Sequence, residues 1–208
     1  YAIPWPTGAI LGDASTILYL AAPDTTKVNP VTGNQMADGC AGSGADGNKL
    51  ATPVWQRSNN NVILRRARNE VVAFKLIVER LVSTLSGVQV VVSDLVGSGG
   101  VIAASPNIEL FRSWYVPSGA VYYPDACIPL ASPFGETFAI PNTTNGISGQ
   151  TNQEVWADVY IPSEAAAGTY NGTITVSSSR AGVLAVIGLE LTVRDWRLPD
   201  RIGFDVGL

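Results

Sequence analysis

Hydrophobic and polar positions alternate most regularly in the last third of the chain, with a period of two residues. Such alternation is typical of strands with one buried face, because successive side chains of a strand point to opposite sides. It predicts strands in EVWADVYI, TYNGTITVS and LELTV, at residues 154–161, 169–177 and 189–193. The side chains expected to point inward are Val155, Ala157, Val159, Ile161, Tyr170, Ile174, Val176, Leu189, Leu191 and Val193.

Earlier segments carry the same signal less clearly. STILYL (15–20), VQVVV (88–92) and NIELFRSWYV (107–116) predict strands, and GSGG (97–100) predicts a turn. EVVAFKLIVE (70–79) fits a strand with Val72, Phe74, Leu76 and Val78 on one face. It also fits a helical stripe, but its β-branched and aromatic content favours a strand.

Connections between these runs differ in length. Residues 21–50 are rich in Gly, Asp and Asn and lack periodicity, so they predict a long loop that is a functional insertion or an interaction arm. Residues 117–153 contain five prolines and predict a long connection that crosses between sheets rather than a hairpin. SEAAAG predicts one helical turn ended by Gly168, and the strand pattern breaks at Pro199.

About seven or eight strands, with no helix longer than a turn or two, predict an all-β fold. We expect an antiparallel two-sheet β-sandwich, Ig-like or jelly-roll-like, with a long N-terminal loop region. Residues 1–50 would form the first strand and the loop or arm, 51–200 the sandwich, and 201–208 a linker.

Composition supports one domain and excludes several partners. The chain has 208 residues, of which 46% are hydrophobic and 14% charged, with 21 Gly and 13 Pro. A net charge of −4 gives no counterion-release reason to bind nucleic acid, and no apolar run is long enough to insert in a membrane. Because the first residue is Tyr1 rather than Met, we expect a processed or excerpted chain at an extracellular, cell-surface or virion-surface location.

Catalytic chemistry is poorly represented. The absence of histidine removes Ser-His and Cys-His schemes, and no phosphate or dinucleotide fingerprint is present. Glu154 and Asp158 share a strand face, but about 13 Å would separate them, farther than glycosidase carboxylates. We expect both to be solvated, and we expect neither an enzyme nor a cofactor.

Binding and modification offer weaker signals. Asp38, Asp46 and Asn48 supply oxygen ligands that calcium prefers, although Asp-Gly pairs are also ordinary turn residues. Cys40 and Cys127 could form one disulfide or stay as two thiols. The remaining signals are two glycosylation sequons, at Asn142 and Asn171.

Aromatic residues are the other binding candidates. Trp156 and Tyr160 are expected on the outward strand face, beside carboxylates, where they could contact a sugar or a partner protein. Packing of Trp156 under a loop or a neighbouring domain is the competing interpretation. Trp114 and Tyr115 cannot both point into the core, so Trp114 is a third candidate contact.

Six segments occur in one order that resembles a known family. They are ARNEVVAFKLIV, VSDL, IELFRSWYV, YYPDACIPL, EVWADVYIPSEAAAGTYNGTITV and LELTVRDWRLPD. The series is similar to the β-sandwich domain that precedes the barrel in glycoside-hydrolase-like proteins of the DUF4091 and family 123 type. That resemblance implies catalytic carboxylates on a barrel, which this chain lacks: it stops at IGFDVGL, about where a first barrel strand would start.

Two function classes follow. The first is a non-catalytic accessory module that packs against a C-terminal barrel or presents it to polysaccharide. The alternative is a structural subunit of an extracellular filament, surface layer or virus particle, with the 21–50 arm contacting neighbouring subunits. A free-standing carbohydrate-binding module is a third interpretation, which requires Trp156 or Tyr160 to be exposed.

Overall fold

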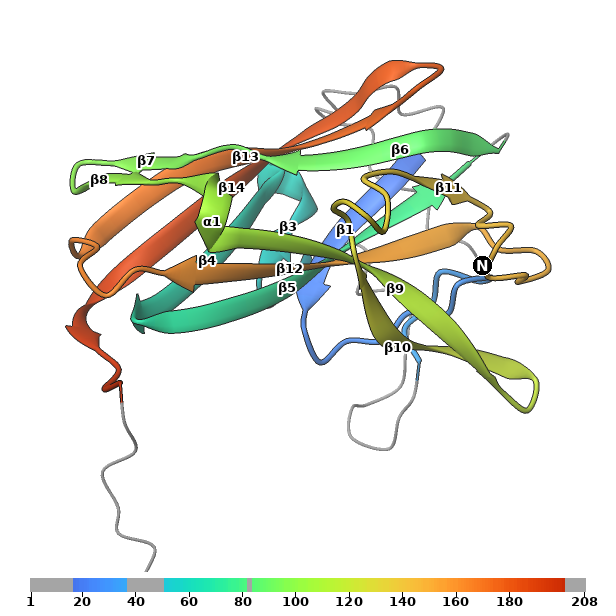
Figure 1. Ribbon diagram of the computed structural model, residues 1–208, viewed down its shortest axis with the longest axis horizontal. Helices are drawn as coiled ribbons and strands as arrows, with labels where there is room; N and C mark the ends of the chain where they lie inside the picture. Colours follow the sequence, from blue (N-terminus) through green and yellow to red (C-terminus); the bar gives the residue numbers. More distant parts are fainter. Residues whose placement is uncertain (1–16, 37–50, 82–83, 201–208) are drawn as a thin grey trace, which may run out of the picture.

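A computed structural model of the chain describes residues 17–36, 51–81 and 84–200. Among these residues it contains fourteen strands, one α-helix of four residues and one 3-10 helix of three residues (Figure 1). No helix in these ranges is long and apolar enough to cross a membrane. The strands are β1 Ile17–Pro23, β2 Ala51–Thr52, β3 Trp55–Gln56, β4 Asn61–Arg68, β5 Glu70–Arg80, β6 Leu85–Val92, β7 Leu95–Gly97, β8 Gly100–Ile102, β9 Ile108–Ser118, β10 Val121–Pro129, β11 Phe138–Ile140, β12 Asn152–Ile161, β13 Gly168–Ser178 and β14 Gly182–Arg197, and the helices are η2 Arg57–Asn59 and α1 Ala104–Asn107.

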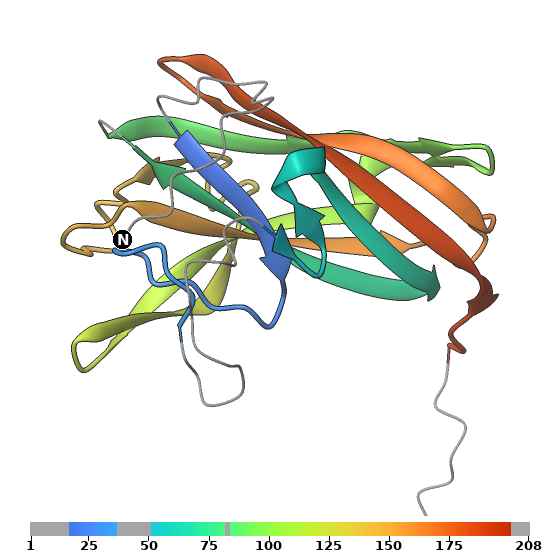
Figure 2. The same ribbon diagram turned by 180° about the vertical axis from the view of Figure 1, so that it is seen from behind.

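Two sheets form a β-sandwich, as the sequence predicts (Figures 1 and 2). The five-stranded sheet has the order β1-β5-β12-β9-β10. The nine-stranded sheet has the path β11-β6-β13-β14-β4-β3-β2, with β7 paired to β13 and β8 paired to β7. All pairs are antiparallel except β14 with β4, which is parallel, so the second sheet is mixed rather than purely antiparallel as expected.

The core lies between the two sheets and confirms the predicted alternation. All ten side chains expected to point inward in the last third are buried. The strand interpretation of residues 70–79 is also correct, because they lie in β5 with Val72, Phe74, Leu76 and Val78 buried. Burial of these side chains between the sheets is the main favourable contribution to folding, at about 25 cal/mol per Å² of apolar surface.

Three local predictions need correction. Residues 117–129 do not wander: β9 and β10 form a hairpin in which Val121 pairs with Ser118 (Figure 1). Prolines are compatible with it because β10 is an edge strand. The expected crossing does occur later, since β11 joins the nine-stranded sheet and β12 returns to the other.

The second correction concerns SEAAAG, which forms a hydrogen-bonded turn rather than one turn of helix. Ala165 N donates to Pro162 O at 3.1 Å, and Gly168, with φ of +145°, already begins β13. The third is the strand count, which exceeds the expected seven or eight because several strands have only two or three residues.

Residues 21–23 of the predicted loop belong instead to β1, and residues 24–36 lie against the five-stranded sheet. Thr151 N and Asn152 N both donate to Pro30 O, at 2.9 and 3.1 Å, and Val28 is buried. This part of the loop therefore covers one end of β12.

Candidate functional site

The corner between β4 and β5 is where the chain passes from the nine-stranded to the five-stranded sheet. A single residue, Asn69, connects the two strands. Its φ is +60°, a left-handed conformation that asparagine tolerates better than most residues. Its backbone N donates to Ile161 O at 2.8 Å, which joins the corner to the end of β12.

The side chain of Asn69 also holds the segment that follows β14. Its Nδ2 donates to Leu198 O at 3.1 Å and to Asp200 Oδ1 at 2.9 Å, and its Oδ1 accepts from Tyr160 Oη at 3.0 Å. Leu198 N donates in turn to Arg68 O at 3.0 Å. One asparagine thus joins β4, β12 and residues 198–200.

Two ion pairs surround this connection. Arg68 Nη2 lies 3.3 Å from Asp195 Oδ1, and Arg197 Nη2 lies 2.7 Å from Asp200 Oδ2. Both pairs are largely exposed, so each contributes little stability.

Large apolar side chains are exposed at the same end of the sandwich. Val71 is 56% exposed, Trp196 55% and Tyr160 36%, and Val71 pairs directly with Tyr160 in the β5–β12 ladder. Figure 1 shows the end of β14 beside the β4–β5 corner at lower left, and Figure 2 shows the same arrangement from behind. We call the set Arg68, Asn69, Val71, Tyr160, Trp196 and residues 197–200 the exit corner.

The opposite end of β12 carries a buried polar cluster. Lys75 Nζ lies 3.2 Å from Glu154 Oε1, and Ser113 Oγ donates to the same oxygen at 2.7 Å. Gln153 Nε2 donates to Ser113 O, and the buried Tyr115 accepts from Glu154 N through its hydroxyl. Burial raises the pKa of the Glu154 carboxyl above its usual range, although Lys75 and Ser113 oppose the shift.

Tyr115 responds to the same cluster. Burial, followed by the negative charge of Glu154, raises the pKa of its hydroxyl well above the ordinary value. The cluster is closed from outside by residues 24–36, because Lys75 Nζ also donates to Thr26 O at 2.8 Å. The Glu154 carboxylate is therefore buried, paired and closed off from solvent.

The prediction that Glu154 is solvated is therefore wrong. It faces outward on β12, but the loop covers it and leaves it 1% exposed. Asp158, in contrast, is half-buried and accepts a hydrogen bond from Trp156 Nε1 at 2.6 Å. The alternation of apolar and polar residues along β12 predicts which face of the sheet each carboxylate lies on, but it does not predict that residues 24–36 cover that face at Glu154.

The three candidate aromatic contacts are not brought together. Trp156 is half-buried, held by Asp158 and with Lys75 Nζ 5.2 Å from its ring centroid. Tyr160 follows on the same face and belongs to the exit corner. Trp114 lies next to Ser113, which faces Glu154, so Trp114 points to the other side of β9, where Arg112 stacks 5.9 Å from its ring.

The remaining predicted positions have mixed outcomes. Asp38, Cys40, Asp46 and Asn48 lie outside the described residues, so the calcium site and the disulfide stay predictions. In the described ranges no group of three or more Cys, Asp or Glu side chains could hold a metal.

Cys127 and the two sequons lie within the described part. Cys127 is exposed on β10. Asn142 is 5% exposed with its Nδ2 buried, and its glycosylation stays a prediction. Asn171 is exposed on β13, and its glycosylation stays a prediction.

Comparison with known protein families identifies the family to which the chain belongs. The family model of the glycoside hydrolase 123 N-terminal domain matches residues 48–178, more than half of the chain. The chain therefore belongs to this family, which confirms the resemblance found in its motifs. No curated protein matches the chain.

Solved structures agree at the level of the fold. A family 123 glycoside hydrolase from Clostridium perfringens, whose structural analysis concerns glycolipid glycan hydrolysis, superposes with a TM-score of 0.55 at 18% identity. The match covers 67% of this chain and 24% of that chain, so this chain spans about a quarter of the hydrolase.

Two other structures are less similar. AvmM, described as catalysing macrocyclization in alchivemycin A biosynthesis, has a TM-score of 0.37 at 8% identity, covering 67% of this chain and 86% of its own. The CooA pilin subunit of enterotoxigenic Escherichia coli has a TM-score of 0.34 at 13% identity, covering 69% and 94%. Such scores carry no functional argument.

Proposed function

We propose that the chain is a non-catalytic accessory domain that packs, through its exit corner, against a C-terminal catalytic domain of a longer polypeptide. The supporting observation is Asn69, which fixes the segment after β14 against the sandwich by two hydrogen bonds. A connection held in this way restricts how a following domain can sit, whereas a free linker would not.

The exposed surface next to that connection supports the same proposal. Val71, Tyr160 and Trp196 are large, apolar and exposed within one corner. Aromatic residues are enriched where protein surfaces meet, because they contribute large contact areas. These side chains are exposed at the end of the sandwich where β14 ends.

The test begins with the intact mass of the protein from its natural source. We expect a mass well above 21.9 kDa, with peptides that continue past Leu208. A mass near 21.9 kDa would leave no room for a catalytic domain and would overturn the proposal.

Charge substitution in the longer polypeptide then tests the surface itself. In the longer polypeptide, Val71→Glu should split the thermal unfolding of the protein into two transitions. The reason is that a charge buried in the contact between the domains uncouples their unfolding. Val183→Glu is the matched control, since Val183 is 57% exposed on β14 outside the exit corner. Equal unfolding profiles for the two variants would contradict packing at this corner.

A second part of the proposal is that the domain presents the catalytic domain to polysaccharide, and it has a separate test. Trp156 is partly covered and Tyr160 is the more exposed aromatic residue on that face. If Trp156→Ala and Tyr160→Ala both retain full polysaccharide binding in a pull-down, neither residue is a sugar contact. An extracellular location likewise stays a prediction.

A further inference from the structure

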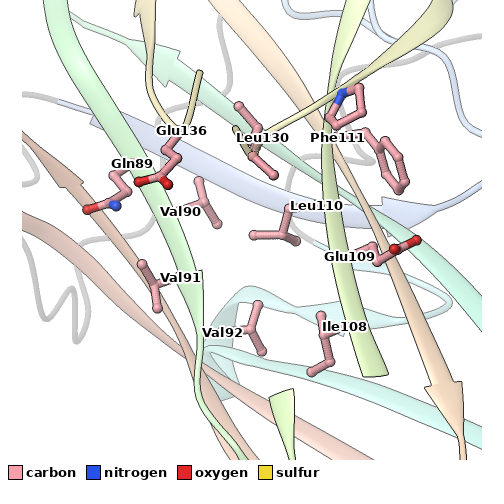
Figure 3. Close-up of a pocket in the computed structure, with 12 residues that line it drawn as sticks. Gln89, Val90, Val91, Val92, Ile108, Glu109, Leu110, Phe111, Leu130 and Glu136 are labelled. Carbon is pink, nitrogen blue, oxygen red and sulfur yellow. The ribbon is translucent and has the colours of Figure 1, made fainter. Parts of the chain in front are cut away.

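A groove opens between the two sheets on the side away from β1. It has a volume of 390 Å³ and lies between β6 and β9. Figure 3 shows Val90 opposite Leu110 and Val92 opposite Ile108, with Leu130 at one end. Ile108, Leu110 and Leu130 are only partly buried, so the groove exposes apolar walls to solvent.

The β6 wall also presents an unpaired strand edge. Ser93 N donates to Thr173 O of β13, and alternate residues of a strand present their main-chain groups to the same neighbour. Residues 89 and 91 therefore face β13, and Val90 and Val92 face the groove. On that edge β11 pairs with β6 at Leu85 and Val88 and extends no farther.

No other described residue replaces the missing pairing. The hydrogen bonds outside the strand ladders include none to the main chain of Val90 or Val92 within the described ranges. Two N–H groups and two C=O groups thus form a row in line with β11. An unpaired row of this kind is a template for another extended chain.

Charge defines the chemistry of the occupant. Glu136 is exposed and, among the described residues, has no ion pair; Figure 3 places its carboxylate beside Gln89, over β6 at the edge of the groove. Glu109 stands on the outer rim beyond β9. The lining includes these two acids and no basic residue. A lysine or arginine is therefore the complementary charge.

We propose that this groove binds an extended segment of a partner polypeptide that adds to β6 as a strand in line with β11. The segment places alternate apolar side chains against Leu110 and Ile108 and directs a basic side chain to Glu136. The inference is independent of the exit corner, because the two surfaces share no residue. It gives the accessory domain a second contact, for a polypeptide other than the domain that follows it.

The test uses the 208-residue chain and a fluorescent, end-blocked peptide of seven residues that alternates valine and lysine. We expect saturable binding by fluorescence anisotropy and perturbed amide signals of Val90 and Val92 by NMR. Methylating the peptide amides that face β6 should abolish binding. Methylating the other amides of the peptide, which point away from β6, should change the affinity by no more than about twofold, because these amides make no hydrogen bond to β6.

Glu136→Lys should lower the affinity for the valine–lysine peptide by about tenfold or more. A peptide with glutamate in place of lysine should bind the Glu136→Lys variant more tightly than it binds the unmodified chain. Glu190→Lys is the control, with the same charge change elsewhere in the nine-stranded sheet. Absence of saturable binding, equal effects of the two methylation patterns, or equal affinities of the two variants would each overturn the proposal. A dimeric mass that becomes monomeric in Glu136→Lys would also overturn it, because the groove would hold a second copy.

Discussion

The two ends of β12 contrast although their sequence pattern is the same. At the N-terminal end the outward Glu154 is buried, paired with Lys75 and covered by residues 24–36. At the C-terminal end the outward Tyr160 is exposed and bonded to Asn69. The first end is therefore closed to solvent, whereas the second exposes an aromatic side chain.

The largest expected effect comes from Lys75→Met at the covered end. Removing the ammonium leaves Glu154 buried without its ion-pair partner, which should cost about 3–5 kcal/mol of unfolding free energy. Urea denaturation measures this loss. The double variant Lys75→Met with Glu154→Gln should recover part of it, and no recovery would show that the two side chains are not energetically coupled.

At the exposed end, Asn69→Ala should cost about 1–3 kcal/mol. Alanine is strained at a φ of +60° and removes the bonds to Tyr160, Leu198 and Asp200. Asn69→Gly separates the two causes, because glycine adopts positive φ without strain but lacks the side chain. Similar losses for both variants would assign the effect to the hydrogen bonds.

The third prediction concerns the pH dependence of stability, which should differ between variants at the Glu154 end and at the Tyr160 end of β12. The folded pKa of Glu154 is raised, so above the ordinary pKa the native state binds more protons than the unfolded state. Stability from this group is present at low pH and is lost as pH rises from the ordinary Glu value, about 4.3, through the raised folded value. Glu154→Gln should lack this decline, whereas Tyr160→Phe should retain it in urea titrations at stepped pH.

The smallest effect is expected for Tyr160→Phe in the 208-residue chain. It removes one exposed hydrogen bond to Asn69, worth about 0.5–1 kcal/mol at most. Thermal unfolding should therefore change little. A loss as large as that of Asn69→Ala would mean that Tyr160 is a major support of the corner rather than an accessible contact.

Sequence reasoning succeeded where alternation alone decides the structure. β12, β13 and β14 follow their predicted faces because their inward positions are uniformly apolar. It failed for Glu154, since the cover comes from residues 24–36, more than a hundred positions away. It also missed the hairpin of β9 and β10, because prolines on an edge strand resemble those of a loop.

The exit corner could be predicted only in part. Asn69 stands between two strand patterns, in RARNEVV, and an asparagine there is compatible with a left-handed connection. Its contacts with Tyr160 and Leu198 join positions 91 and 129 residues away, and no local pattern encodes them. The groove was missed because an unpaired edge becomes apparent only when the ends of β6 and β11 are known.

The parallel pairing of β14 with β4 has a mechanical consequence. β14 lies between β13 and β4, and its backbone hydrogen bonds run across its axis. Tension applied through residue 200 pulls β14 lengthwise, so it loads both ladders in shear and many bonds must yield together. Tension at this end would therefore be resisted by both ladders of β14 together.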